Sequence, residues 1–386
     1  MENFVFHNPV KVIFGKGQIA ALGREIPEFS RVLLAYGGGS VKANGVHDQV
    51  VAALTEAGIP FTEFGGIEPN PRYETLMTAV EIVREQNLNF ILAVGGGSVV
   101  DGCKFIAAAV PFAGDPWSLA TGAKVRTALP LGAVLTLPAT GSEMNGFSVV
   151  SREETKEKFG FGSPLLMPKF SILDPETTFS LPERQIGNGI VDAFIHVLEQ
   201  YLTFPADAPL QDRMAEAVMQ TLIEVAPAAM ATPPDYQARA SLMWAATMAL
   251  NGLVGVGVPQ DWATHMIGHE LTALTGIDHA RTLAAVWPGV VAVRRDAKRA
   301  KLLQYAKRVW GVSNGSEDGT IDLAIARTRA FFESVGVATS LTAAGAPTSV
   351  VEEIPARLTK RKAPSWGERG DIDPDTVRQI LTVALK

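Results

Sequence analysis

The apolar residues of this chain change their spacing near the middle of the sequence. In the first half, short apolar runs such as Arg31–Tyr36, Phe90–Val94 and Leu131–Pro138 alternate with segments of helical spacing. Apolar strands that alternate with helices are typical of a parallel sheet covered by helices on both faces. The sequence therefore predicts a Rossmann-like, dinucleotide-binding α/β domain over residues 1–182.

Beyond residue 182 the apolar spacing is helical only. Segments 190–202, 210–230 and 321–335 show apolar residues at the intervals of a helix face, and we find no convincing strand pattern among them. The second domain, residues 183–386, is therefore expected to be all-helical. A chain of 386 residues is long enough for two domains, because domains typically contain about 100–200 residues.

Composition narrows the possible partners and compartment. The chain has 34 basic and 40 acidic residues and no strong basic patch, so nucleic acid is not an expected partner. The densest positive run, Arg294–Lys301, is interpreted as a solvated helix face.

The cysteine content and the apolar runs bear on the compartment. The single cysteine, Cys103, excludes an internal disulfide and favours a cytoplasmic location. The longest apolar run, Met243–Val258, is shorter than the roughly 20 residues that span a bilayer, so no membrane span is expected.

Glycine runs follow two of the expected strands, at Gly37–Ser40 and Gly95–Ser98. A glycine turn between a strand and a helix lets backbone N–H groups approach a phosphate. Neither run is the G-x-G-x-x-G fingerprint or a Walker A loop, so each could also be a turn without a ligand. Two such turns at the carboxyl edge of one sheet favour a nucleotide. The polar segment Thr136–Asn145 follows a third strand and would suit ribose, phosphate or carboxamide groups, or form an ordinary polar loop.

Imidazole and carboxylate groups recur at helical spacing in the second half. Asp192 and His196 lie four residues apart in an apolar segment, His265 and His269 repeat that spacing, and His279 follows. Burying such groups costs free energy unless they are paired or bind a metal. A set of one Asp and several His without a thiolate suits Fe(II) or Zn(II). Core histidines and a general acid–base site are the alternatives.

Four motifs carry a resemblance to a known family. They are "GGGSVVD" (Gly95–Asp101), "LPATGSE" (Leu137–Glu143), "GIVDAFIHVLEQYL" (Gly189–Leu202) and "VPQDWATHMIGHELTALTGIDHA" (Val258–Ala280). The chain resembles the iron-containing, or group III, alcohol dehydrogenases, and most of all their NADPH-dependent butanol dehydrogenase and broad aldehyde reductase branch. The resemblance implies an α/β nucleotide domain followed by a helical domain, an architecture shared with dehydroquinate synthase.

The resemblance also implies a site. It assigns the metal to one carboxylate and three imidazoles, namely Asp192, His196, His265 and His279. His269 would lie near the nicotinamide and serve proton transfer, and Lys158 is the second candidate catalytic residue. The positions that match cofactor contacts of the family are Gly38, Ser40, Asn70, Gly96, Gly97, Ser98, Asp101, Thr136, Thr140, Asn145 and Lys158.

Cofactor choice is expected to depend on the first glycine turn. NAD-preferring members of the family place an acid near Gly38, where it would repel a 2′-phosphate. Here no acid lies between Gly37 and Ser40, and Lys42 follows, so NADP(H) is expected. The implied reaction is reversible hydride transfer between the nicotinamide and an aldehyde or primary alcohol, with Fe(II) or Zn(II), in a homodimer.

Two other functions stay open at this stage. A metal-dependent lyase similar to dehydroquinate synthase would surround a phosphorylated substrate with basic residues, whereas Met266, Ile267 and Leu271 make the segment near His265 apolar. That apolar character favours simple aldehydes. A nucleotide-binding protein without activity is the other alternative. The presence of all four expected metal ligands, one Asp and three His, argues against it.

Overall fold

The computed structural model describes all 386 residues, which form two compact units. The sheet unit comprises His7–Pro182 and Pro233–Thr247. The helical unit comprises Met1–Phe6, Glu183–Thr232 and Met248–Lys386. The domain limits 1–182 and 183–386 stay a prediction. The first six residues belong to the helical unit, and residues 233–247 belong to the sheet unit.

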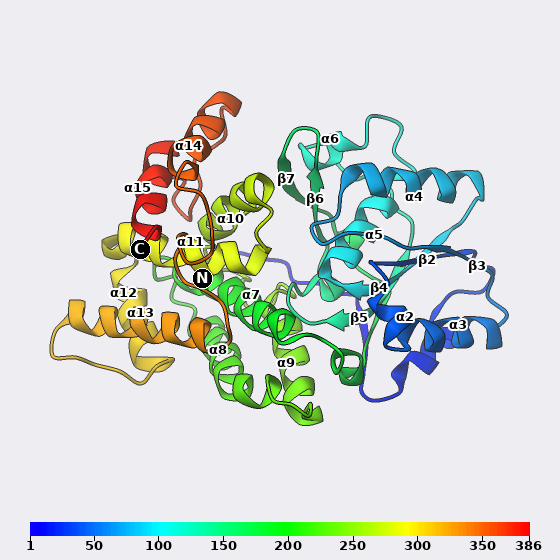
Figure 1. The fold of residues 1–386 in the computed structure, drawn as a ribbon, viewed down its shortest axis with the longest axis horizontal. Coiled ribbons are helices and arrows are strands. Elements are labelled where there is room, and N and C mark those ends of the chain that lie inside the picture. Colours follow the sequence, from blue (N-terminus) through cyan, green and yellow to red (C-terminus); the bar gives the residue numbers. More distant parts are fainter. The chain divides into compact units, whose positions relative to one another are not determined.

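The sheet unit is built on a six-stranded sheet in the order β1-β8-β5-β4-β2-β3, in which every pair is parallel (Figure 1). These strands are β1 (Lys11–Phe14), β2 (Val32–Tyr36), β3 (Phe61–Phe64), β4 (Phe90–Gly96), β5 (Leu131–Leu137) and β8 (Phe170–Leu173). The register pairs Ala35 with Ala93 and Val94 with Val134. The central strands are buried along almost their whole length, which explains their unbroken apolar sequences. The predicted α/β fold is confirmed.

Helices pack on both faces of this sheet. They are α2 (Ser40–Ala43), α3 (Val46–Glu56), α4 (Tyr73–Glu85) and α5 (Gly97–Ala109). Because successive strand residues point to opposite faces, Val32 and Leu34 of β2 pack with residues of α3, and Leu33 and Ala35 pack with residues of α4 and α5. Because all strands of this sheet are parallel, the turns that follow them meet at the same edge of the sheet.

The sheet unit also contains short elements that the apolar spacing did not reveal. They are η1 (Gln18–Ala21), α1 (Leu22–Glu25), α6 (Trp117–Ala120), η2 (Ser142–Met144), β6 (Phe147–Arg152), β7 (Glu157–Gly162), η3 (Pro164–Leu166) and η4 (Pro175–Thr178). Strands β6 and β7 form an antiparallel hairpin. Helix α9 (Tyr236–Ala249) joins this unit through Met243, which packs against Leu135 and Leu173.

The helical unit contains the remaining helices and no strand. They are α7 (Glu183–Tyr201), α8 (Pro209–Ala229), α10 (Ala263–Thr275), α11 (His279–Val293), α12 (Arg295–Arg308), α13 (Glu317–Ser334), α14 (Val350–Arg361) and α15 (Pro374–Ala384). Residues of α10, α11, α14 and α15 share one apolar core. None of the helices has the length and apolar character that a membrane crossing requires. The all-helical prediction for this part of the chain is confirmed.

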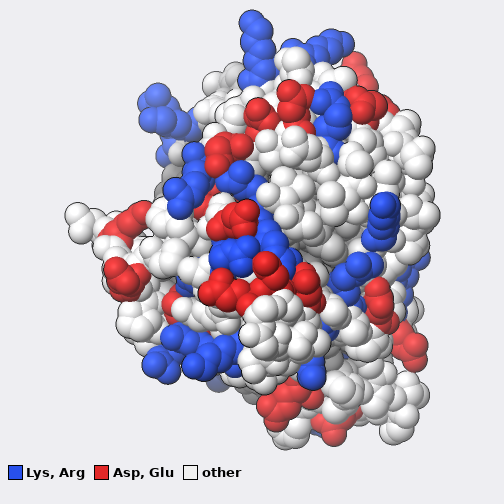
Figure 2. All heavy atoms as spheres, turned by 90° about the vertical axis from the view of Figure 1, so that its left-hand side faces the viewer, with Lys and Arg blue, Asp and Glu red and all other residues white.

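The surface of the helical unit carries mixed charges. Figure 2 shows Lys and Arg side chains close to Asp and Glu side chains on one face. On α12, Arg295 and Arg299 pair with Asp318 at 3.2 and 2.9 Å. Lys298 and Lys301 of the same run are buried, with 2% and 5% exposure. The interpretation of Arg294–Lys301 as a solvated helix face is wrong for these two lysines, because they have acidic partners inside the unit.

Candidate metal centre and cofactor site

Three of the predicted metal ligands form a compact group. Asp192 on α7, His265 on α10 and His279 at the start of α11 each offer a ligand atom, and these atoms all lie within 4.8 Å of one another. Asp192 Oδ1 lies 3.9 Å from His279 Nε2 and 4.0 Å from His196 Nε2. The rings of His196 and His265 stack, with centroids 4.7 Å apart. The structure thus brings Asp192, His265 and His279 together from three helices, with the ring of His196 beside that of His265.

Local structure explains this convergence. Asp192 and His196 lie one turn apart on α7 and are buried, so both project from the same face of the helix. Helix α10 ends at Gly276, whose φ of 73° is the left-handed conformation that glycine adopts readily. A β-carbon on Gly268 would lie only 2.7 Å from Leu283 Cδ2, so this glycine lets α10 and α11 pack closely.

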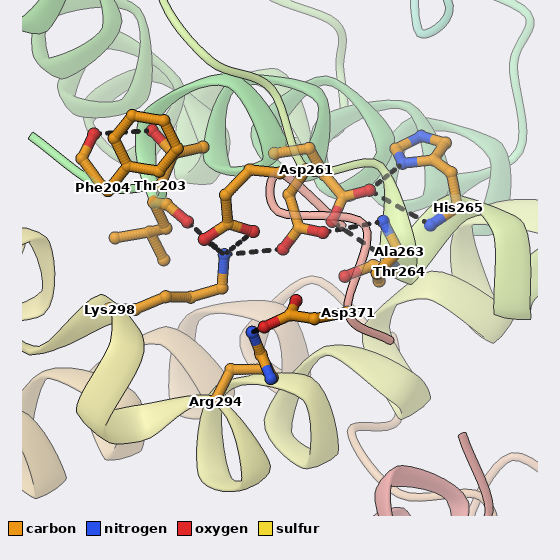
Figure 3. A network of polar contacts seen from close by, with 12 residues as sticks. Thr203, Phe204, Asp261, Ala263, Thr264, His265, Arg294, Lys298 and Asp371 are labelled. Atoms are coloured by element: carbon orange, nitrogen blue, oxygen red, sulfur yellow. Dashed lines mark hydrogen bonds and ion pairs between the residues drawn. The ribbon is translucent and has the colours of Figure 1, made fainter. Parts of the chain in front are cut away.

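The ring of His265 has an acidic partner outside the ligand group. Its Nδ1 lies 3.0 Å from Glu199 Oε2 (Figure 3). Glu199 was not among the residues predicted for the site. The signal was present, because Glu199 follows Asp192 by seven residues and His196 by three, which places it on the same face of α7.

The start of α11 is also held by polar contacts. Asp278, which directly precedes His279, accepts hydrogen bonds from Arg184 Nε and Asn188 Nδ2, both at 2.9 Å. Both donors belong to α7, so these contacts connect the helix that carries Asp192 with the residue before His279, the predicted ligand on α11. Asp278 was not among the predicted site residues, because only the fold brings it next to α7.

His269 lies beside the ligand group. Its ring centroid is 5.1 Å from that of His279 and 6.5 Å from that of His265. The expected role of His269 in proton transfer stays a prediction.

The apolar residues near His265 in the sequence differ in where their side chains lie. The indole ring of Trp262 lies 5.1 Å from the His265 ring, whereas Ile267 belongs to the fully buried core of the unit.

The donor set fits a divalent metal. Asp192 supplies a carboxylate oxygen, and the histidines supply imidazole nitrogens, which are the donors that Fe(II) and Zn(II) accept. The only thiol, Cys103, is buried on α5 in the sheet unit and is not among these donors. Metal-binding imidazoles often have a carboxylate on their other ring nitrogen, and Glu199 contacts His265, a predicted ligand, in this way.

The predicted phosphate turn lies between β4 and α5. Gly96 precedes the helix and Gly97 is its first residue. A β-carbon on Gly97 would collide with the side chain of Thr140, and one on Gly96 would lie 3.0 Å from Leu137 Cβ. These glycines therefore allow the start of a 13-residue helix to approach the chain after β5, with its N–H groups at the sheet edge.

Asn70, Ser98 and Lys158 also come together at this edge. Asn70 N donates to Ser98 Oγ at 3.2 Å, and Lys158 Nζ donates to Asn70 Oδ1 at 2.8 Å. These predicted cofactor contacts come from three distant parts of the sheet unit. Gly38 and Ser40 lie at the end of β2, where Lys42 Nζ is 3.1 Å from Glu63 Oε2.

Asp101 and Lys104 hold the polar segment after β5. The Asp101 carboxylate accepts hydrogen bonds from Ser142 Oγ and from Val149 N. Lys104 Nζ donates to Ser142 Oγ at 2.8 Å and to Asn145 Oδ1 at 3.1 Å. Burial lowers the pKa of Lys104 to about 8, although Asp101 and Glu143 oppose this shift. The segment that contains Thr140 and Asn145 is therefore held by two side chains of α5, the partly buried Asp101 and the buried Lys104.

Family comparisons agree with this arrangement. The family model described as "Iron-containing alcohol dehydrogenase" matches residues 9–175. The model described as "Fe-containing alcohol dehydrogenase family, C-terminal" matches residues 187–385. Together the two matches span both halves of the chain.

Individual relatives match over most or all of the length. The chain is 55% identical to the NADPH-dependent aldehyde reductase YqhD of Escherichia coli, over 100% of both chains. It is 45% identical to the probable NADH-dependent butanol dehydrogenase 1 of Bacillus subtilis, over 87% of this chain and 88% of that protein. The crystal structure of E. coli YqhD matches over 99% of each chain, with a TM-score of 0.97. The crystal structure of a butanol dehydrogenase from Thermotoga maritima is 40% identical in sequence and matches over 100% of this chain and 99% of the other, with a TM-score of 0.95. The chain belongs to the iron-containing alcohol dehydrogenase family.

Proposed function

We propose that this protein is a metal-dependent, NADP(H)-linked alcohol dehydrogenase that reduces aldehydes and, in reverse, oxidises primary alcohols. The observation that carries the proposal is the group of Asp192, His265 and His279, whose ligand atoms lie within 4.8 Å of one another in a family member. The named relatives are reductases and dehydrogenases, which favours this reaction over the lyase alternative.

The helical unit would hold the metal through Asp192, His196, His265 and His279. Either Fe(II) or Zn(II) fits these donors. A bound metal supplies Lewis-acid polarisation of the carbonyl, and the nicotinamide supplies the hydride. His269, next to His279, would hold or move the proton that the product oxygen gains or loses. The ring of Trp262 would exclude water beside His265.

The sheet unit would bind the cofactor. Gly96, Gly97 and Ser98 would receive the pyrophosphate at the start of α5. Lys158 would act beside the nicotinamide, held by Asn70. The other proposed contacts, in the segments described above, are Gly38, Ser40, Asp101, Thr136, Thr140 and Asn145.

NADP(H) is proposed over NAD(H) because no acid lies in the segment from Gly37 to Ser40. A carboxylate there would repel the 2′-phosphate, whereas Ser40 offers a hydroxyl. The E. coli relative is named as NADPH-dependent and the B. subtilis relative as probably NADH-dependent, so cofactor preference is the property of this family member that most needs measurement.

A homodimer in the cytoplasm is also part of the proposal. Strand β1 is an edge strand of the sheet, and Phe14 at its end is 40% exposed beside Trp244. An edge strand offers backbone groups for pairing with a second copy. Light scattering of the purified protein would test the dimer. The single, buried Cys103 is compatible with a reducing compartment.

The test is metal analysis combined with reduction of butanal. We expect about one Fe or Zn per chain and consumption of NADPH with a kcat/KM at least about tenfold above that with NADH, a difference of about 1.4 kcal/mol. A metal-loaded protein that binds NADPH but consumes none with a panel of aldehydes would refute the proposed activity.

A further inference from the structure

The hydrogen bond between Glu199 and His265 belongs to a buried network that extends to Asp261 and Lys298. Figure 3 shows the labelled residues of this network. Glu199 Oε2 lies 3.0 Å from His265 Nδ1 and 3.2 Å from the backbone N of the same residue. Glu199 Oε1 accepts from Thr264 N at 3.2 Å. The Glu199 side chain is 3% exposed, so water does not compete for these contacts. One carboxylate therefore holds both the ring and the backbone of His265.

The same carboxylate satisfies the beginning of α10. Trp262, before the helix, adopts a left-handed conformation with φ of 64° and provides no side-chain cap. The first N–H groups of a helix lack partners within the helix. Here Ala263 N donates to Asp261 Oδ1 at 3.2 Å, while Thr264 and His265 donate to Glu199. Negative charge at this end is favourable for the helix dipole. The position of His265 thus depends on a carboxylate from α7.

A buried lysine supports the network from the other side. Lys298 Nζ lies 2.6 Å from Asp261 Oδ2 and 3.0 Å from Glu368 Oε1, and it also donates to the Leu202 carbonyl. Asp261 N in turn donates to the backbone oxygen of Glu199 at 2.9 Å. Lys298 therefore balances carboxylate charge next to Glu199 and connects α12 to the segment that precedes α10.

We propose that Glu199 is a positioning residue for the metal centre, which fixes the orientation and tautomer of His265. A proton on Nδ1 that is donated to Glu199 leaves the lone pair of Nε2 for the metal. The inference rests on the proposed metal-dependent function. It goes beyond that function by assigning a role to Glu199, which is not one of the proposed metal ligands.

The experiment compares metal release from Glu199→Ala, Glu199→Gln and Glu216→Ala. Glu216 is the control, because it is a buried carboxylate of the same unit that accepts from Tyr201 OH at 2.8 Å and contacts no ligand. Each protein is loaded with Zn²⁺, and the rate at which the zinc passes from the protein to a chelator is measured. The wild-type chain and each variant are also loaded with Co²⁺ and their visible absorption spectra are recorded, and kcat and KM for butanal are measured for each.

Glu199→Ala is expected to bind zinc roughly 10–100 times more weakly, with correspondingly faster release and an altered cobalt spectrum. Glu199→Gln should lose less, because its amide oxygen can still accept from His265 Nδ1. Glu216→Ala should release zinc at the wild-type rate. A graded loss, rescued in part by glutamine, distinguishes ring orientation from general destabilisation.

Wild-type release rates and an unchanged cobalt spectrum in both Glu199 variants would overturn the inference. Equal acceleration in Glu216→Ala would overturn it too, since the effect would then reflect stability alone. If Glu199→Ala does not fold, the nearly isosteric Glu199→Gln decides the outcome. A wild-type chain that binds neither metal would instead refute the proposed function, so the two failures are distinguishable.

Discussion

The most deeply buried lysine of each unit, Lys104 in the sheet unit and Lys298 in the helical unit, has its own kind of partner. Lys104 in the sheet unit donates to acceptors of the segment 142–147, which are a hydroxyl, an amide oxygen and a backbone carbonyl. Lys298 in the helical unit pairs directly with the carboxylates of Asp261 and Glu368. The first lysine organises a nearby loop, whereas the second connects segments far apart in the sequence.

The difference shows how each unit supports its part of the site. Lys104 lies on α5 and orders the loop that carries the proposed cofactor contacts Thr140 and Asn145. Lys298 belongs to the network behind His265, a proposed metal ligand. The comparison predicts that substitutions in one unit change cofactor binding and those in the other change metal binding.

The largest effect is expected at the metal centre itself. His265→Ala should lose the metal and, with it, activity by at least about a thousandfold, because it removes a ligand and its Lewis-acid chemistry. His269→Ala should keep the metal and lose activity by about 10²–10⁴, the range of general acid–base catalysis. Metal analysis and initial rates check both. Loss of metal from His269→Ala would show that the ligand assignment is wrong.

The next effect is on stability of the helical unit. Lys298→Met would leave Asp261 and Glu368 buried without their cation, and breaking a buried ion pair in this way costs about 3–5 kcal/mol. Urea unfolding should show this loss. The control is Arg299→Met on the same helix, whose pairs with Asp296 and Asp318 are exposed, so that its cost should stay below about 1 kcal/mol. Equal losses in the free energy of unfolding for the two variants would mean that the buried pairs of Lys298 stabilise the protein no more than exposed pairs do.

The smallest effect is expected at Lys104. Lys104→Met should raise KM for NADPH several-fold and leave the metal content unchanged, because it loosens only the loop of the sheet unit.

The same variant also tests the pH dependence of stability. The pKa of Lys104 is lowered from 10.5 to about 8 in the folded protein, so the unfolded chain binds more protons between these pH values. The wild-type free energy of unfolding should therefore gain up to about 3 kcal/mol, relative to the variant, as pH rises through that range. Parallel stability curves for the two proteins, or loss of metal from the variant, would contradict this.

Sequence reasoning succeeded where the signal was periodic or local. The fully apolar strands predicted the parallel sheet because β2, β4 and β5 are buried on both faces. The spacing of Asp192 and His196 placed both on one face of α7, where the structure has them. The family motifs predicted four metal ligands, and the structure places the donor atoms of three of them, Asp192, His265 and His279, within 4.8 Å of one another, while metal binding itself stays a prediction.

It failed where a residue acts through distant partners. Arg294–Lys301 was interpreted as solvated because its charges alone are typical of a surface, yet Lys298 finds Asp261 and Glu368 in the interior. Glu199 has the right helical phase to face the ligands, but phase cannot show that its carboxylate meets the start of another helix.

The sequence by itself determined the two kinds of architecture, the glycine turn at Gly96 and Gly97, and the residue types that could bind a metal. These follow from periodicity and local backbone conformation, which depend on neighbours in the chain. Only the tertiary structure decided that His265 and His279 meet Asp192, and that Glu199 and Lys298 stand behind them. Those contacts join helices that are tens of residues apart in the sequence. The hydrophobic effect packs these helices but is not directional, so local sequence does not determine which buried charges meet. The geometry of the whole core determines that pairing.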